Sequence, residues 1–363
     1  MLSGDKEFCM TRFRSVLTVV SILSSLIATT APAAPPESLP ASAYTHPQEL
    51  VVVAPGRRLN VYCLGEGSPT VLFDAGLGDG TMGWRAVQGE IAKTTRACTY
   101  DRANYFFSDT VDRRATAQAA VEDMLALIDH AKLGDRVILV GHSRGGLNVR
   151  LFTYEHANRV AGLVLVDPTV TEKLSSAATA YYVHKYENYL ARGQQLENCW
   201  HAAQQHALQP EGADSLKCLD DFGAQQDPNE RVLAHTIRTM ETQPAYQATL
   251  FSERQNLFYP IDNDGDSIDG RSIALAEHSL GDLPLVVISA DWFKSITFKG
   301  TPTVEQREFL SWNSEQMRHI ADESTRGQFI KVPSRHYVQK ERPDVVIGAI
   351  EHLIHLCRVP AYP

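Results

Sequence analysis

The chain has 363 residues, a formal net charge of −9, 44% hydrophobic residues and 21% charged residues. The apolar fraction is typical of a packed globular protein and excludes a disordered chain, and a chain of this length buries a large core without disulfides or metals. Acidic residues outnumber basic ones by 43 to 34, and no run of Lys and Arg occurs. Because contacts to phosphates require a basic surface, this balance disfavours a nucleic-acid partner.

Residues 1–33 are predicted to be a secretory signal peptide. A basic stretch at residues 10–14 precedes an apolar run at residues 16–28, and residues 31–33 (Ala-Pro-Ala) offer small side chains at the two positions that a signal peptidase reads. The apolar run is too short to span a bilayer, so we expect no stable membrane span. Residues 34–48 contain several prolines and are expected to form an exposed leader. The mature protein is therefore predicted to be secreted or periplasmic, with a buried N-terminal helix as the alternative.

From about residue 49 to residue 170, short β-branched runs alternate with helical patterns. Strands are expected at residues 59–64, 70–73, 96–100, 136–140 and 163–166, and helices at residues 84–92 and 119–131. The first two strands are expected to pair with each other. The run that ends at residue 140 is continuously apolar, as in strands that are covered on both faces. This alternation predicts an α/β fold with a mostly parallel central sheet flanked by helices.

The pattern changes between residues 171 and 282. This segment has helical periodicity, many Ala, Gln and Glu residues and no convincing buried strand. An insertion of this size between two core strands predicts a helical cap over the strand ends. The core resumes at residues 283–363, with strands expected at residues 285–288 and 329–332 and a last helix at residues 344–354. The expected organisation is one core in two segments, 49–170 and 283–363, with a cap between them.

The sequence Gly141-His142-Ser143-Arg144-Gly145-Gly146 directly follows the strongest predicted strand and precedes a helix expected at residues 147–155. A Gly-x-Ser-x-Gly motif between a strand and a helix predicts a nucleophile elbow. The glycines leave room for a turn so tight that the serine takes a strained backbone conformation and its hydroxyl stands clear of the sheet. The N–H of Arg144, at a helix N-terminus, then faces an oxyanion. Ser143 is therefore the candidate nucleophile, and a simple tight turn is the alternative.

These residues resemble the α/β-hydrolase superfamily, and in particular its capped serine esterase and lipase-like branch, from about residue 50 to the C-terminus. Residues 71–78 stand where the family has a strand followed by His-Gly and the oxyanion loop; Ala75 replaces the histidine and Gly76 is retained. The resemblance implies that the N–H groups of Leu77 and Arg144 form an oxyanion hole. Tyr100-Asp101-Arg102-Ala103 resembles another family turn, in which Asn104 replaces the usual glycine, so we expect a remodelled pocket wall.

The general base is expected after the last core strand. His336, in Ser334-Arg335-His336-Tyr337, follows the strand at residues 329–332, and the final helix opens as it does in the family. The chain order serine, acid, histidine makes His336 the candidate that takes the proton from Ser143 and returns it to the leaving group. His142, beside the serine, is expected to serve in packing or pocket lining.

Two aspartates compete for the role of the acid that orients this histidine. Asp167 ends the strand at residues 163–166, and Asp291 ends the later strand. The family usually places its acid after the later strand but a few residues further on, where Trp292 and Phe293 stand in this chain. Some branches use the earlier strand, where Asp167 has the matching register. We therefore predict Asp167 and keep Asp291 as the alternative.

Loss of the signal peptide would leave five cysteines in an oxidising compartment, where disulfides persist. The odd number leaves at least one thiol free or paired between chains. Cys199 and Cys218 are close in sequence and are expected to staple the cap; no Cys-x-x-Cys or His-x-x-x-His spacing supports a metal site instead. The strand order of the family would make Cys63 and Cys98 neighbours, which suggests a second disulfide, with two small buried residues as the alternative.

The acidic run at residues 262–269 is similar to a calcium-binding loop. It lacks the Gly at the sixth position and the Glu at the twelfth that such a loop requires. We therefore predict a solvated acidic turn, and calcium at residues 262–266 stays open.

Together these features predict a secreted serine hydrolase that cleaves a carboxylic ester or lactone through an acyl-enzyme, with no cofactor and no metal. The expected partner is a small-molecule ester, and Tyr105, Phe106, Phe107 and tyrosines at residues 181, 182, 186 and 189 suggest that it carries an apolar group. Ser143 argues against epoxide hydrolases and haloalkane dehalogenases, whose nucleophile is an aspartate. The alternatives are an aminopeptidase or amidase with the same triad, and a ligand-binding protein without catalytic activity. The oligomeric state stays open.

Overall fold

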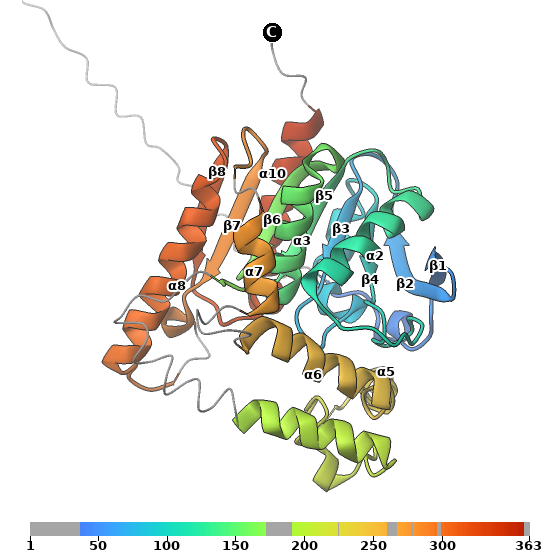
Figure 1. Cartoon of the computed structure of the whole chain (residues 1–363). Helices are drawn as coiled ribbons and strands as arrows, with labels where there is room; N and C mark the ends of the chain where they lie inside the picture. Colours follow the sequence, from blue (N-terminus) through green and yellow to red (C-terminus); the bar gives the residue numbers. More distant parts are fainter. Residues whose placement is uncertain are drawn as a thin grey trace, which may run out of the picture. The chain divides into compact units, whose positions relative to one another are not determined.

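The computed structural model describes residues 37–171, 191–223, 225–259, 267–276, 279–295 and 299–358. They contain an eight-stranded sheet in the order β1-β2-β4-β3-β5-β6-β7-β8 (Figure 1). The strands are β1 (Glu49–Ala54), β2 (Arg57–Leu64), β3 (Val71–Asp74), β4 (Ala97–Tyr100), β5 (Val137–His142), β6 (Val160–Val166), β7 (Leu285–Ala290) and β8 (Gly327–Val332). The pairs β1–β2 and β2–β4 are antiparallel and the other pairs are parallel. The predicted α/β fold with a mostly parallel sheet is confirmed.

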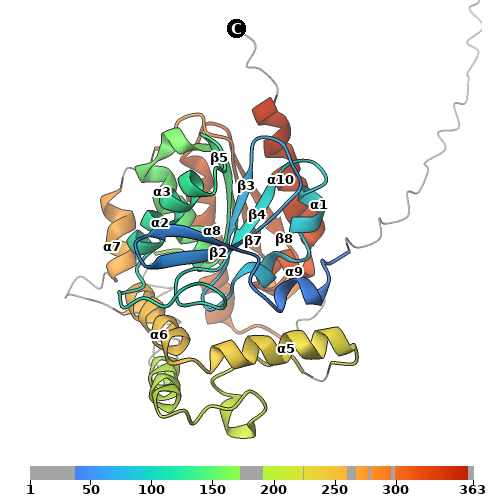
Figure 2. The same ribbon diagram turned by 90° about the vertical axis from the view of Figure 1, so that its right-hand side faces the viewer.

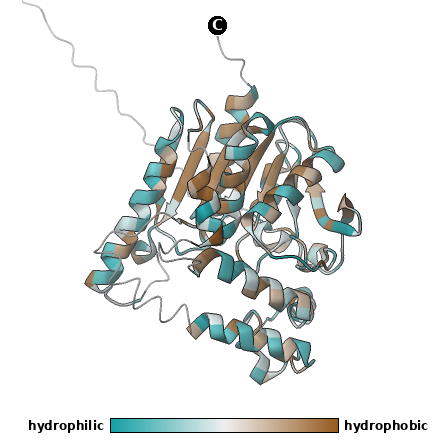
Figure 3. Ribbon diagram, viewed as in Figure 1, coloured by the Kyte–Doolittle hydropathy of each residue, from teal (hydrophilic) through white to brown (hydrophobic). Residues whose placement is uncertain are grey.

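Helices cover both faces of this sheet. They are α1 (Gln88–Ile91), α2 (Ala117–His130), α3 (Arg144–Glu155), α8 (Val304–Asp322), α9 (Val338–Glu341) and α10 (Pro343–Arg358). Alternate strand residues face opposite layers: Leu139 and Leu163 pack with α2, α3 and α8, whereas Ile138 and Val164 pack with α1 and α10. The central strands carry the hydrophobic colour in Figure 3. Burial on both faces explains the continuous apolar runs of β5 and β6.

Two predicted features of the first half are wrong. The strands expected at residues 59–64 and 70–73 do not pair with each other, because β2 pairs with β1 and β4 while β3 lies between β4 and β5. All four residues of β3 are buried, which suits a central strand with a neighbour on each edge. The helix expected at residues 84–92 is not continuous: the 3₁₀ turn η2 (Thr81–Trp84) ends at its first residue, and only the short α1 is helical, because Gly89 disfavours a longer helix. The sequence patterns also do not predict β1 and α8.

Helices occupy the described parts of the chain between β6 and β7. They are a helix at residues 191–204, α5 (Pro228–Glu241), α6 (Pro244–Phe258) and α7 (Ile268–Leu275). Figures 1 and 2 both place α5 and α6 beyond one end of the sheet. This end carries the carboxyl ends of the parallel strands, because the Tyr246 hydroxyl of α6 donates a hydrogen bond to the carbonyl of Gly78, after β3, at 2.8 Å. The boundaries of the cap at residues 171 and 282 stay predictions.

Several predicted features lie outside the described residues. These are the signal peptide at residues 1–33, the first residues of the leader, and Tyr181, Tyr182, Tyr186 and Tyr189 of the predicted cap. The described part of the leader is not exposed throughout as predicted, because the 3₁₀ turn η1 (Ala41–Tyr44) buries Ala41 and Tyr44 against α5. Within the ranges that the structure does describe, no helix combines the length and the apolar character needed to cross a membrane.

Two disulfides join the predicted cysteine pairs. Cys63 and Cys98 lie directly opposite each other on β2 and β4, with their Cα atoms 4.1 Å apart. Cys199 and Cys218 have Cα atoms 5.5 Å apart and tie the helix at residues 191–204 to the turn that precedes α5. Cys357 is a free, half-buried thiol. Both expected pairs are therefore disulfides, and Cys357 is the one free thiol among the described residues.

Candidate active site

Ser143 lies at the junction of β5 and α3. Its backbone φ of +52° is in the left-handed region, which residues other than glycine rarely adopt. A Cβ atom on Gly145 would lie 2.3 Å from the carbonyl oxygen of Asp74, and one on Gly141 would lie 2.4 Å from the carbonyl oxygen of Gly145. Neither glycine therefore accepts a larger residue, and the tight turn of the motif follows from these contacts.

The loop after β8 brings His336 to Ser143. The His336 Nε2 atom lies 2.9 Å from Ser143 Oγ, and the histidine side chain is 35% exposed. The rings of Trp292 and Tyr337 lie near the imidazole, and their centroids are 6.0 and 5.7 Å from the centroid of the His336 ring. A partly exposed imidazole at hydrogen-bond distance from a hydroxyl is able to accept its proton.

Asp167, at the carboxyl end of β6, contacts the other side of the histidine. Its Oδ2 atom lies 2.7 Å from His336 Nδ1, and its Oδ1 atom accepts a hydrogen bond from the N–H of Ala290 at 3.0 Å. The φ of Asp167 is +41°, so the chain leaves the extended conformation at this residue. Ser143, His336 and Asp167 are thus joined by consecutive hydrogen bonds, although they come from three separate segments.

Asp291, the alternative acid, lies elsewhere. It follows β7, and its Oδ2 atom lies 3.5 Å from Lys294 Nζ and 3.9 Å from Lys331 Nζ. Of the two predicted acids, the structure brings Asp167 and not Asp291 into contact with His336.

Two backbone N–H groups predicted to bind an oxyanion lie near Ser143. Arg144 is the first residue of α3, and Leu77 follows Gly76 in the loop after β3. A Cβ atom on Gly76 would lie 3.5 Å from Ser143 Cβ, so this loop passes against the elbow. Within the described residues, neither N–H has a hydrogen-bond acceptor. Unpaired N–H groups in this position, one of them at a helix N-terminus, are able to stabilise negative charge.

His142 is fully buried behind the triad. Its Nε2 atom lies 3.0 Å from the carbonyl oxygen of His336, and the two rings are 4.7 Å apart. Burial, with the nearby His336 as a second cause, holds the pKa of His142 well below its ordinary value. His142 is therefore neutral near pH 7 and supports the loop of His336 by packing and a hydrogen bond.

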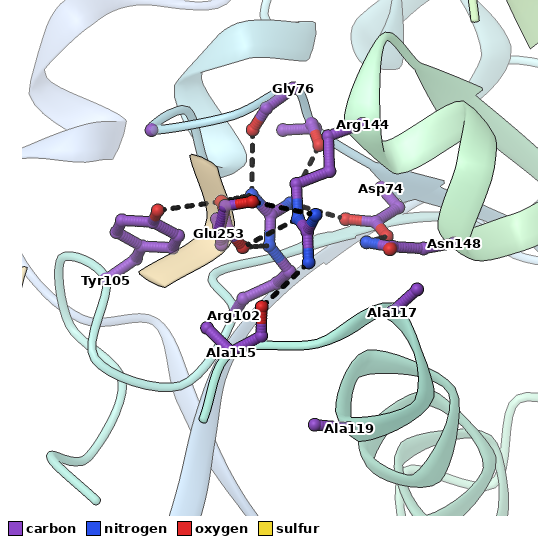
Figure 4. Close-up of polar contacts among 12 residues, drawn as sticks. Asp74, Gly76, Arg102, Tyr105, Ala115, Ala117, Ala119, Arg144, Asn148 and Glu253 are labelled. Atoms are coloured by element: carbon purple, nitrogen blue, oxygen red, sulfur yellow. Dashed lines mark hydrogen bonds and ion pairs between the residues drawn. The ribbon is translucent and has the colours of Figure 1, made fainter. Parts of the chain in front are cut away.

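A buried ionic network beneath the loop after β3 was not predicted (Figure 4). Arg102, at the carboxyl end of β4, and Arg144 both contact Glu253 of α6, at 3.0 and 3.2 Å. The Tyr105 hydroxyl donates a hydrogen bond to Glu253 at 2.8 Å, so this residue of the expected pocket wall is buried in the network. The Tyr-Asp-Arg sequence indicated Arg102, but no motif indicated Glu253.

Asp269 belongs to the same network, which corrects the prediction of a solvated acidic turn at this residue. It is fully buried, and its carboxylate accepts hydrogen bonds from Arg144 Nη1 at 2.6 Å and from the N–H of Ala117 at 2.7 Å. The carboxylate is buried because it neutralises a guanidinium that is itself inaccessible to water. Residues 262–266 lie outside the described ranges. In the described part of the chain, no three His, Cys, Asp or Glu side chains are grouped to hold a metal.

Acidic residues also lie in or beside the loop after β3, where Tyr246 contacts both Gly78 and Glu241. Asp79, two residues after Leu77, lies 3.9 Å from Lys340 Nζ. The N–H of Asp220 donates a hydrogen bond to Glu241 at 2.8 Å, and Tyr246 lies 3.4 Å from the same carboxyl group. Burial, followed by the charge of Asp220, raises the pKa of Glu241 to about 8. Glu241 is therefore largely protonated at neutral pH.

The family of the chain follows from comparison with known proteins. A family model described as alpha/beta hydrolase fold matches residues 69–291, more than half of the chain. The uncharacterized protein YqjL of Bacillus subtilis (strain 168) is 26% identical over 121 residues, which are 33% of this chain and about half, 48%, of the length of that relative.

Solved structures share the fold at low sequence identity. A malate-bound thermophilic esterase from Thermogutta terrifontis matches with a TM-score of 0.53 and 18% identity, over 85% of this chain and 98% of its own. The ligand-free epoxide hydrolase CorEH matches with a TM-score of 0.59 and 17% identity, over 85% and 98% of the two chains. With the family model and this shared architecture, the chain belongs to the α/β-hydrolase fold family.

Proposed function

We propose that the protein is a secreted serine hydrolase that cleaves a carboxylic ester or lactone through an acyl-enzyme. One observation carries this proposal: Ser143 Oγ lies 2.9 Å from His336 Nε2, and His336 Nδ1 lies 2.7 Å from Asp167 Oδ2. A hydroxyl, an imidazole and a carboxylate in this order activate a serine as a nucleophile.

In the acylation step, Ser143 Oγ attacks the carbonyl carbon of the ester while His336 Nε2 takes the hydroxyl proton. The electron pair of the C=O bond moves onto oxygen, where the N–H groups of Leu77 and Arg144 stabilise the negative charge. When the C=O bond re-forms, the bond to the leaving alkoxide breaks and His336 returns the proton to it. The acyl group remains on Ser143.

In the deacylation step, His336 takes a proton from water, and the hydroxide attacks the acyl carbon. A second tetrahedral oxyanion forms and collapses, the bond to Ser143 Oγ breaks, and the serine regains its proton from His336. Asp167 keeps the proton of the neutral imidazole on Nδ1 and stabilises the imidazolium in both steps. The carboxylic acid leaves, and the enzyme returns to its starting state.

Export of the protein and an apolar substrate are part of the proposal. The predicted signal peptide is supported by the two disulfides, because disulfides persist in oxidising compartments. Trp292 and Tyr337, whose rings lie near that of His336, are 37% and 41% exposed, which suits contact with an apolar acyl or alcohol group.

An aminopeptidase or amidase with the same triad is the second candidate. Asp79, two residues after Leu77, favours a substrate with a free amine, because a carboxylate attracts an ammonium group. Lys340 Nζ lies 3.9 Å from Asp79 Oδ2 and 4.4 Å from the centre of the Tyr337 ring, so Asp79 lies near the residue that follows His336. An aminoacyl p-nitroanilide tests this candidate against p-nitrophenyl acetate.

The central test is labelling with a fluorophosphonate that reacts only with activated serines. We expect the wild-type protein to be labelled on Ser143 and to hydrolyse p-nitrophenyl acetate. S143A should lose the label and lower kcat by several orders of magnitude, whereas the matched variant S272A, on α7, should behave like wild type. If the wild-type protein neither reacts with the fluorophosphonate nor hydrolyses an ester or anilide, the proposal is wrong and a binding protein is favoured.

A further inference from the structure

Arg102 clamps the loop after β3. Its Nη1 atom donates hydrogen bonds to the carbonyl of Ala75 at 2.7 Å and to Asp74 at 2.8 Å, and its Nη2 atom donates to the carbonyl of Gly76 at 2.8 Å (Figure 4). Its Nε and Nη2 atoms also donate to the two carboxylate oxygens of Glu253, at 3.0 and 3.3 Å. These contacts use all five N–H groups of the guanidinium. The group is therefore held in one orientation.

By holding this loop, Arg102 also fixes the N–H of Leu77, which points to the side of the loop away from Arg102. The carbonyl of Gly76 and the N–H of Leu77 belong to the same peptide unit, and this unit is trans. In a planar trans peptide the C=O and N–H bonds point in opposite directions. When Arg102 holds the Gly76 carbonyl, it therefore directs the Leu77 N–H away from itself, and it also polarises that N–H through the hydrogen-bonded carbonyl.

Glu253 links this clamp to the second oxyanion donor. Its Oε1 atom lies 3.0 Å from Arg102 Nε and 3.2 Å from Arg144 Nε, and its Oε2 atom accepts the hydrogen bond from Tyr105. Burial alone would raise the pKa of Glu253, but the two guanidinium charges outweigh it and the pKa is lowered. One ionised carboxylate of α6 thus contacts both the arginine that orients the Leu77 peptide and the residue that supplies the other N–H.

We propose that Glu253 is a positioning residue for the oxyanion hole. It touches no reacting atom; it acts through Arg102, whose guanidinium it orients so that the Gly76 and Ala75 carbonyls are both bound. Without its charge, Arg102 keeps only Asp74 as a carboxylate partner, and the Leu77 peptide loses its fixed orientation. This inference rests on the proposed function, because it assumes that Leu77 and Arg144 stabilise an oxyanion.

The test compares E253Q with wild type on p-nitrophenyl acetate and on its thiono analogue, in which sulfur replaces the carbonyl oxygen. We expect kcat for the oxygen ester to fall about 10- to 100-fold with KM within about twofold, because an oxyanion donor acts mainly in the transition state. Sulfur accepts hydrogen bonds poorly, so the thiono ester gains little from the oxyanion hole in either protein. The preference for the oxygen ester should therefore shrink at least about fivefold in E253Q.

The matched control is E323Q. Glu323 forms a similar partly buried group, with Arg150 at 2.7 Å and Tyr154 at 2.5 Å, and it makes no contact with the loop after β3. We expect E323Q to keep the wild-type kcat and the wild-type preference for the oxygen ester. A loss of kcat in E253Q with an unchanged preference, or an equal change in E323Q, would show a structural role only and overturn the proposal.

A second variant keeps the test decisive if E253Q does not fold. R102K retains the charge that pairs with Glu253 but lacks the planar fork that reaches two carbonyls at once. R102K should also show a lower kcat and a smaller preference for the oxygen ester. If both stay at the wild-type values in R102K, Arg102 does not orient the Leu77 peptide. Fluorophosphonate labelling and the activity assay together separate the two proposals. A wild-type protein that is neither labelled nor active on an ester or anilide refutes the hydrolase itself, whereas labelled variants with wild-type preference refute only the role of Glu253.

Discussion

Substitution of Asp167 by Asn should impair the proposed triad through the tautomer of His336. The Asp167 Oδ1 position accepts a hydrogen bond from the Ala290 N–H at 3.0 Å, so the amide oxygen of the asparagine must remain there. Its NH₂ group then takes the Oδ2 position, 2.7 Å from His336 Nδ1, and donates to that nitrogen. The imidazole proton is forced onto Nε2, which faces Ser143 and is no longer able to accept the serine proton. Asn tolerates the φ of +41° as well as Asp, so the backbone should not change.

We expect D167N to lower kcat about 10³- to 10⁴-fold, which corresponds to about 4–5.5 kcal/mol of lost transition-state stabilisation. D291N is the matched control, because Asp291 is paired only with lysines at 3.5 and 3.9 Å among the described contacts, and pairs of this kind contribute about 1 kcal/mol or less. Its kcat should stay within about fivefold of wild type. The assay is ester hydrolysis by proteins with matched circular dichroism spectra. A large loss in D291N together with a small one in D167N would refute this reasoning.

Two further predictions concern stability. The pKa of Glu241 is raised from its ordinary 4.5 to about 8, so the unfolded chain ionises this group first and the folded state loses stability as the pH rises from about 4.5 to 8. E241Q should remove this loss, about 2–5 kcal/mol at pH 8, and flatten the pH dependence of Tm. A pH dependence as steep as that of wild type would mean that Glu241 is not its source. The Cys199–Cys218 disulfide closes a loop with a sequence separation of 19, so the C199S/C218S variant should lose about 3 kcal/mol of its free energy of unfolding. Urea unfolding followed by fluorescence measures this loss, and an unchanged midpoint argues against the contribution.

The sequence alone indicates Ser143 and His336 as candidates because their signals are local. A strand, a tight turn and a helix follow one another at Ser143, and His336 follows directly on the last core strand. The same local patterns located most strands but not their neighbours: β3 is inserted between β4 and β5, and such pairing depends on contacts that are distant in sequence.

The choice of the candidate acid and the contact between Arg102 and Glu253 are not visible in local patterns. Asp167 and Asp291 follow β6 and β7, which are adjacent parallel strands, so both leave the sheet at the same edge and sequence spacing does not separate them. The contact with His336 depends on the backbone turn at Asp167. Glu253 is 151 residues from Arg102, and its position within a helix of mixed polarity gives no sign that it is buried against a cation.

The ionic contacts of α6 and α7 limit how the segment between β6 and β7 can be exchanged among proteins of this fold. A chimera that replaces residues 171–282 removes Glu253 and Asp269 together. Arg102 then keeps only Asp74 as a carboxylate partner, and Arg144 loses both of the carboxylates that it contacts. An uncompensated buried charge costs about 3–5 kcal/mol, a large share of the stability of most domains. A transplanted segment must therefore place two carboxylates where they contact the two core arginines. Substitutions in the segment and in the core are thus constrained to change together.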